Sequence, residues 1–133
     1  MFMAHDLTLP AVQALVAQGE SQTLELKKST AEKDRACRTL CAMANGQGGV
    51  VVFGVTPAGK LVGQQVTDRT LEELAQEFQG FEPPLFPVVE RKVVAETDGK
   101  RLELLWVQVD KARHAPVSFR GVPYERVLNT TRV

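Results

Sequence analysis

Three charged residues near the start of the sequence are spaced so that they could act together on a phosphate. Glu25 and Lys27 alternate with Leu24 and Leu26, so in a strand they would share the outward face, and Glu20 lies just before them. Two carboxylates brought together in this way could hold a divalent cation, because Mg²⁺ prefers oxygen ligands and commonly uses one or two carboxylates together with substrate phosphates. The alternative, from the residue types alone, is a solvated strand edge with a Glu–Lys pair.

A second group of candidate residues lies at the end of the sequence. Tyr124 is followed by Arg126, and Arg132 comes after the polar run 129–131. An aromatic ring and guanidinium groups beside hydroxyl and amide groups suit phosphate contact or base stacking. A terminal strand with incidental arginines explains the pattern equally well, so both interpretations stay open.

The glycine-rich run 45–49, Asn-Gly-Gln-Gly-Gly, could present backbone N–H groups to a phosphate. It follows a predicted helix and precedes a predicted strand, however, whereas phosphate-binding loops open a helix. The sequence has no Gly-Lys-Ser/Thr motif, so ATP binding has little support. These glycines are expected to end the helix and to let backbones approach closely.

The remaining candidate side chains favour structural roles. Cys37 and Cys41 lie four residues apart on one helical face and are expected to be buried thiols, because no paired cysteine or histidine motif accompanies them. His5 and His114 have no catalytic partner at a recognisable spacing. Trp106 lies in an apolar run and is expected in the core.

The elements that must position these residues follow from apolar periodicity and turn residues. Thr70 and Glu73 have the spacing of a capping box at the start of a helix, and Asp98-Gly99 predicts a hairpin turn. The expected helices are 10–18, 30–44 and 70–78, and the expected strands are 23–27, 50–53, 88–95, 101–109, 117–120 and 124–127, the last two joined at Gly121. Together they predict one α+β domain over residues 1–133, with a mixed sheet of about six strands packed with about three helices. Strand 50–53 is expected at the centre of the sheet because it is almost entirely apolar.

Length and composition indicate an ordinary globular protein. Of the 133 residues, 44% are apolar and 24% are charged. No apolar run reaches the roughly 18–20 residues that a transmembrane helix needs. No basic stretch followed by an apolar one opens the sequence, so we expect no membrane partner and a location in the cytoplasm.

The net charge is zero, but the charges are unevenly distributed. Residues 68–110 carry ten acidic and five basic side chains, whereas residues 111–133 carry five basic side chains and one acidic side chain. A local basic surface can attract phosphate even when the total charge is neutral.

Four motifs, in order along the chain, resemble the Schlafen-type AlbA-like domain, which occurs in bacterial transcriptional regulators and helicase-like proteins. The motifs are Glu20-Ser21-x-x-Leu24-Glu25-Leu26-Lys27, Ala42-Met43-Ala44-Asn45-x-x-Gly48-Gly49-Val50-x-x-Phe53-Gly54-Val55, Gly59-x-x-Val62-Gly63 and Tyr124-x-Arg126-Val127. The resemblance covers about residues 20–132 and implies an α+β fold with nucleic acid as the ligand. In animal Schlafen proteins two such lobes clamp structured RNA, which for a single lobe implies a homodimer.

Some members of the resembled family are endoribonucleases that depend on Mg²⁺ or Mn²⁺ and use three acidic residues. The first two correspond to Glu20 and Glu25. The third belongs in an aspartate-rich turn directly after a Gly-Val pair, and this turn reads Thr56-Pro57 here. Cleavage would therefore need an acid from elsewhere, such as Asp68.

Three functions follow as hypotheses. The first is a nucleic-acid-binding domain, acting on DNA or structured RNA in a regulatory role. The second is a metal-dependent nuclease in which Glu20 and Glu25 hold the cation and Lys27 steadies the scissile phosphate. The third is a non-catalytic protein-interaction module. The residues expected to contact nucleic acid are Lys27, Lys28, Arg120, Tyr124, Arg126 and Arg132.

Overall fold

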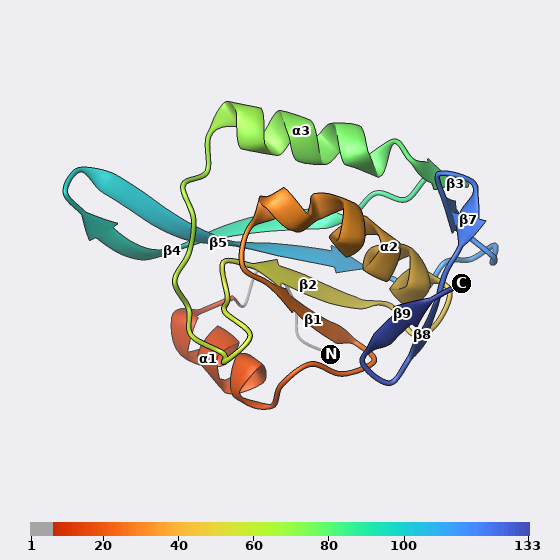
Figure 1. The fold of residues 1–133 in the computed structure, drawn as a ribbon, viewed down its shortest axis with the longest axis horizontal. Helices are drawn as coiled ribbons and strands as arrows, with labels where there is room; N and C mark the ends of the chain where they lie inside the picture. The colour runs from red at the N-terminus through yellow and green to blue at the C-terminus, as the bar shows by residue number, and fades with distance from the viewer. Residues whose placement is uncertain (1–6) are drawn as a thin grey trace.

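A mixed four-stranded sheet separates two layers of helices in the computed structural model, which describes residues 7–133 (Figure 1). The strand order is β1-β2-β5-β4. β1 pairs with β2 in parallel, and the other pairs are antiparallel. The strands are β1 (Leu24–Lys27), β2 (Gly49–Phe53), β4 (Val88–Thr97) and β5 (Lys100–Val109). The α+β class and the mixed sheet are confirmed, with the strands divided among three sheets rather than joined in one.

Alternating side chains of the central strand, β2, pack against different helices on the two faces of the sheet. Val50 and Val52 of β2 pack with α1 (Leu9–Ala17) in one buried cluster. Val51 and Phe53 pack in a second cluster with α2 (Lys33–Ala44), and Leu74 of α3 (Asp68–Phe78) belongs to this cluster too. All five residues of β2 are buried, as expected for a strand covered on both faces.

The glycine-rich turn after α2 has the structural role that its position indicates. Gly48 has φ +82°, and a Cβ there would lie 2.8 Å from the Val109 carbonyl oxygen. A Cβ on Gly49 would lie 2.6 Å from Met43 Sδ. The turn therefore needs glycine so that the end of α2 can return closely into the sheet.

The end of the chain forms two short hairpins rather than the single one expected. β6 (Ser118–Phe119) pairs with β7 (Val122–Pro123) and also with β3 (Phe81–Glu82). β8 (Glu125–Val127) pairs instead with β9 (Thr130–Arg132). The prediction that segments 117–120 and 124–127 pair with each other was therefore wrong.

Two further sequence predictions are corrected at helix starts. The second helix begins with a 3₁₀ turn (Thr30–Glu32) before α2. In α3 the capping box joins Thr67 and Thr70 instead of Thr70 and Glu73. Both Thr67 and Thr70 carry hydroxyl groups, which allows the reciprocal bonding that a Glu normally supplies.

The expected core residues are confirmed. Cys37 and Cys41 are buried free thiols, and burial raises the pKa of Cys37 to about 12. Trp106 is buried, whereas His114 is exposed. His5 lies outside the described residues. Within the described part of the chain, no helix combines the length and apolar character that crossing a bilayer requires.

Candidate nucleic-acid interface

The charged residues of β1 are positioned by its place at one edge of the sheet. Leu24 packs toward α1, so Glu25 and Lys27 face the α2 side. The backbone N–H and C=O groups of Leu24 and Leu26 point away from β2, since Thr23 and Lys27 use their carbonyl groups to bond the β2 side. β1 thus presents an acidic face and a backbone edge that β2 does not cover, where Leu24 exchanges hydrogen bonds with Ser21.

Glu25 is buried against an arginine from the end of the chain. Its Oε2 accepts a hydrogen bond from Arg126 Nη1 at 2.9 Å, and the Arg126 side chain is 1% exposed. Arg126 Nη2 also donates to the carbonyl oxygens of Ser21 (2.8 Å) and Leu24 (3.2 Å). Thr131 accepts from Arg126 Nη1 at 3.1 Å. The alternative interpretation, a solvated strand edge with a Glu–Lys pair, is therefore wrong for Glu25.

Glu20 meets the same cluster from the loop before β1. Its Oε2 accepts a hydrogen bond from the Leu26 backbone N–H at 2.9 Å, which occupies part of this backbone edge. Burial and a hydrogen bond with the Glu20 carboxyl group raise the pKa of Glu25 to about 7, against the opposing charge of Arg126. Burial acts to raise the pKa of Glu20 as well, but its bonds with Glu25 and Leu26 lower it overall. The two carboxyl groups are thus coupled, with the pKa of Glu25 raised and that of Glu20 lowered.

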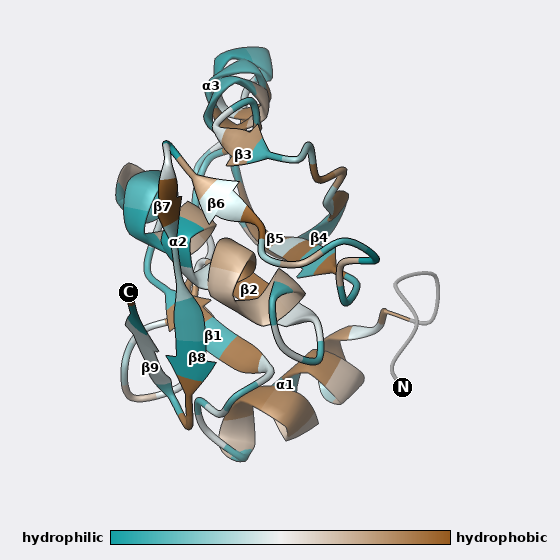
Figure 2. Cartoon of the chain, turned by 90° about the vertical axis from the view of Figure 1, so that its right-hand side faces the viewer, coloured by the Kyte–Doolittle hydropathy of each residue, from teal (hydrophilic) through white to brown (hydrophobic). Residues whose placement is uncertain are grey.

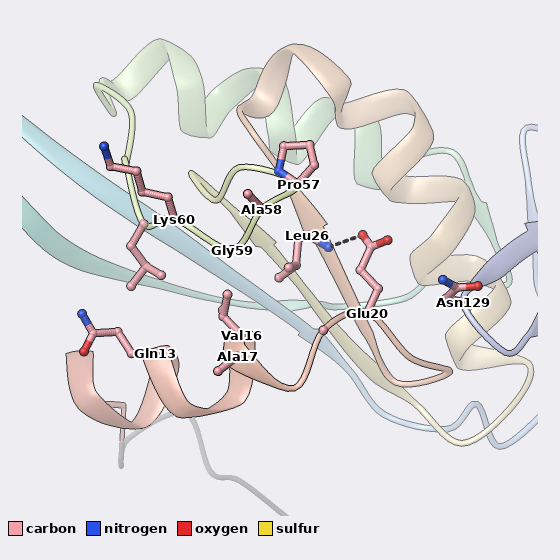
Figure 3. Close-up of a pocket in the computed structure, with 12 residues that line it drawn as sticks. Gln13, Val16, Ala17, Glu20, Leu26, Pro57, Ala58, Gly59, Lys60 and Asn129 are labelled. Atoms are coloured by element: carbon pink, nitrogen blue, oxygen red, sulfur yellow. Dashed lines mark hydrogen bonds between the residues drawn. The ribbon is translucent and has the colours of Figure 1, made fainter.

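A groove beside Glu20 contains the turn that follows Gly54-Val55. Nucleases of the resembled family carry their third acidic residue in this turn. This open groove has a volume of about 690 Å³ and is lined by Glu20, Leu26 and the turn 57–60. Figure 3 shows the Glu20 carboxyl group beside Leu26, joined to its backbone N–H by a hydrogen bond, with Pro57 above Leu26 in the view. Asp68 is not a substitute, because it begins α3 and its charge acts on Arg91 of β4, at the other edge of the sheet from β1, where Glu103 and then Asp68 raise the pKa of that guanidinium.

The residues present do not fit a divalent cation at this position. Glu25 already accepts a hydrogen bond from the Arg126 guanidinium, and its raised pKa means that it favours a proton. A cation would have to displace both before it gained two anionic ligands. In residues 7–133 no group of three or more His, Cys, Asp or Glu side chains could hold a metal ion.

A separate cluster of arginines lies where α2 meets the final hairpins. Asp34 on the first turn of α2 accepts from Arg38 Nη2 at 2.8 Å and from Arg120 Nη1 at 3.3 Å. The Arg38 guanidinium lies over the Tyr124 ring, 6.0 Å from its centroid. Arg120 Nη2 also donates to Glu77 of α3 at 2.8 Å. We call Arg38, Tyr124 and Arg120 the arginine–tyrosine cluster.

Figure 2 shows this end of the molecule, where β6, β7, β8 and β9 lie beside α2. The arginine–tyrosine cluster and the buried pair of Glu25 and Arg126 are joined through α2. Thr39, next to Arg38 in sequence, shares a hydrogen bond with Thr131 of β9 at 2.8 Å and lies 3.5 Å from Glu25 Oε2. Of the late arginines, Arg126 meets the acidic pair inside the protein, whereas Arg120 pairs with Asp34 and Glu77 and Arg132 pairs with Glu125.

The other predicted contact residues differ in how far their side chains are exposed and in whether they are already paired. Lys28 is exposed, whereas Lys27 is mostly buried and lies 3.9 Å from Glu32. Arg132 is 61% exposed and pairs with Glu125 at 2.7 Å. The expectation that Arg126 contacts nucleic acid is corrected, because its guanidinium is enclosed by protein acceptors.

Sequence reasoning missed Arg38 as a candidate residue. Its position over Tyr124 depends on the path of the chain between residues 38 and 124, which no local motif records. Spacing offers one signal: Asp34 and Arg38 lie four apart on a helix, which predicts an ion pair and a fixed guanidinium.

A comparison with protein families adds an independent finding. A family model described as Schlafen, AlbA_2 matches residues 20–133. No curated protein matches the chain.

Proposed function

Because the chain belongs to the Schlafen, AlbA_2 family, we propose that it binds nucleic acid through the arginine–tyrosine cluster. The observation that carries the proposal is the position of Arg38 over Tyr124, with Arg120 on the other side of Asp34. The family points to a nucleic-acid-related role, and this cluster supplies a surface of suitable chemistry.

The cluster offers two kinds of contact to a nucleic acid. The side chains of Arg38 and Arg120 are 47% and 58% exposed, so each guanidinium keeps N–H donors that a phosphate could engage. Tyr124 is half-buried, with the Arg38 guanidinium over its ring, and supplies an aromatic surface for contact with a base or sugar. Asp34 holds the two arginines at a fixed separation, which reduces the entropy lost on binding.

Phosphate contacts at the rim extend this surface. Lys28 is exposed, and the ion-pair partner of Arg132 within residues 7–133 is the exposed Glu125. Exposed ion pairs contribute little stability, so Arg132 can exchange Glu125 for a phosphate at small cost. The neutral net charge of the chain is compatible with binding, because Arg38 and Arg120 are brought together on Asp34.

A salt-dependent binding assay tests the proposal. The double substitution Arg38→Ala, Arg120→Ala should reduce affinity for labelled duplex DNA and for a hairpin RNA by roughly tenfold or more. The slope of log affinity against log salt between about 50 and 200 mM should fall by roughly 2, since two phosphate contacts are lost. Fluorescence anisotropy measures both quantities.

The matched control is the double substitution Arg69→Ala, Arg101→Ala. Both of these arginines are exposed and each pairs with a carboxylate, but they lie on α3 and β5, outside the cluster. The control should bind like the unaltered protein. Equal loss in both doubles would show that overall charge, not the cluster, governs binding, and no binding by the unaltered protein would end the proposal.

We infer that binding occurs without cleavage at the acidic pair. Arg126 occupies Oε2 of Glu25 and the Leu26 N–H occupies Oε2 of Glu20, so the pair keeps fewer unengaged oxygens for a nuclease metal than two solvated carboxylates would. In the same assay with Mn²⁺ added, the labelled RNA should keep its length. RNA shortened by the unaltered protein but not by Glu25→Ala would instead support the nuclease.

A further inference from the structure

The strand at the far edge of the sheet from β1 has an apolar and charged outer surface. β4 is the last strand in the order β1-β2-β5-β4. Among residues 7–133, the large apolar side chains that remain exposed include Phe86, Val88 and Val93, all on β4 or just before it. Figure 1 shows the β4–β5 hairpin extending past the helices.

The direction of the free backbone groups on β4 follows from its partner. Glu103 of β5 bonds Gln64 through both its N–H (2.8 Å) and its C=O (2.9 Å), on the side of β5 away from β4. Alternate residues point their backbone groups to opposite sides, so Leu104 and Trp106 bond toward β4. Their partners Lys92 and Glu90 therefore bond inward. Val89, Arg91 and Val93 consequently direct their N–H and C=O groups outward.

We propose that β4 pairs with β4 of a second copy, antiparallel and centred on Arg91. This register places Val89 opposite Val93 of the second copy, so every outward backbone group in the stretch finds a partner. It also places Glu90 opposite Lys92 of the second copy, twice by symmetry. Within residues 7–133 neither Glu90 nor Lys92 has an ion-pair partner, so both charges are available.

Neighbouring registers bring like charges together. Centring the pair on Glu90 would place two glutamates directly opposite, and centring it on Lys92 would place two lysines opposite. Like charges in directly opposed positions destabilise a strand pair. The sequence of charges along β4 therefore selects the register centred on Arg91.

The two arginines at the centre of the proposed pair do not carry free charge. Arg91 donates to Glu103 through Nε (2.9 Å) and Nη2 (2.8 Å), and the Glu103 side chain is 5% exposed. Each copy thus contributes a neutral pair at the axis rather than a repelling cation.

An apolar groove lies on the face of the sheet that carries the side chains of Val89 and Arg91. It has a volume of about 290 Å³ and is lined by Val89 and Arg91 of β4 and by Leu71, Ala75 and Phe78 of α3, among others. Val93 of the second copy, opposite Val89, would lie at the mouth of this groove. Covering the exposed Val93 in each copy adds apolar burial to the backbone bonds.

This surface is independent of the proposed nucleic-acid interface, which lies by the opposite edge of the sheet. It supplies a contact for the homodimer expected from the sequence. A five-residue strand pair with one groove per copy is a small interface, so we expect a dissociation constant of roughly micromolar order.

Charge exchange tests the pairing. Glu90→Lys makes both facing residues lysine, and Lys92→Glu makes both glutamate, so each single variant should be monomeric in sedimentation velocity. An equimolar mixture of the two variants should form a heterodimer, because each lysine then faces a glutamate. The double variant Glu90→Lys, Lys92→Glu should dimerise like the unaltered protein.

Three results would overturn the proposal. The unaltered protein could remain a monomer at concentrations of roughly 100 μM, well above the expected dissociation constant. It could form a dimer that both single variants retain, which would place the interface elsewhere. Alternatively, the mixture could fail to associate although both variants are folded by circular dichroism, which would show that charged residues only protect this edge.

Discussion

The carboxyl group of Glu25 makes stability depend on pH in a defined direction. Burial and Glu20 raise its pKa to about 7, from 4.5 for an ordinary glutamate. A raised pKa means that the folded protein favours the protonated form. The stability contributed by protonated Glu25 is complete below pH 4.5 and is lost as the pH rises to about 7. The pKa of Glu20 is lowered from 4.5, so the stability that its ionised form contributes is lost as the pH falls below 4.5.

Glu25→Gln should remove this dependence. Between pH 4.5 and 7 the free energy of unfolding of the unaltered protein should fall, relative to the variant, by on the order of 2–3 kcal/mol. Urea denaturation at a series of pH values measures the difference. Parallel profiles for the two proteins would mean that Glu25 is ionised throughout, held so by Arg126.

At the residue scale, sequence reasoning identified the charged residues but not which of them are buried. Glu25 and Arg126 lie 101 positions apart, so no spacing rule links them. An arginine near the end of a chain favours exposure by composition alone. Only the return of β8 and β9 alongside α2 encloses it.

Asn45 fixes the final segments to the end of α2 through three hydrogen bonds. Its Nδ2 donates to the carbonyl oxygens of Val117 (2.8 Å) and Tyr124 (2.9 Å), and its Oδ1 accepts from the Val117 N–H at 2.6 Å. Asn45→Ala should lower the free energy of unfolding by about 3 kcal/mol, because it removes three bonds and leaves a buried N–H without a partner. Thermal and urea denaturation measure the loss.

Gln47→Ala, in the same turn but exposed, is the control and should change stability by less than about 0.5 kcal/mol. Asn45→Asp should lie between the two, since it keeps the acceptor for Val117 and loses both donated bonds. A loss in Asn45→Ala no larger than in the control would show that the final hairpins hold their place without it.

At the element scale, regular periodicity predicted the long elements and failed on the short ones. α1, α3 and the hairpin of β4 and β5 lie close to their expected positions. Strands of two or three residues, such as β6 and β8, are too short for a period to be visible, so their partners were assigned wrongly. Their pairing is decided by tertiary bonds such as those of Asn45.

For the whole molecule, α1 matters although the family match begins after it. The match covers residues 20–133, whereas α1 ends at Ala17. Val12 and Val16 of α1 are nevertheless buried against the sheet face that carries Trp106. The helix completes the three-layer arrangement, so the fold depends on residues beyond the matched region.

Val16→Asp should destabilise the protein by more than about 3 kcal/mol, because it buries a carboxylate without a partner. Gln13→Asp, exposed on the same helix, should be nearly neutral. Thermal denaturation, with dye binding to exposed apolar surface as a second measurement, separates them. Similar melting temperatures for both variants would show that α1 is dispensable.

The two outer strands of the sheet, β1 and β4, differ in whether their backbone edges can pair with another chain. Along β1, the carbonyl of Leu24 and the N–H groups of Leu26 and Lys28 are engaged by Arg126, Glu20 and Glu32. Edge-to-edge growth into a filament needs an accepting strand on both sides of every molecule. With one side closed by its own side chains, association at β4 ends after a single step. Raising the concentration should therefore saturate a pair without producing fibres.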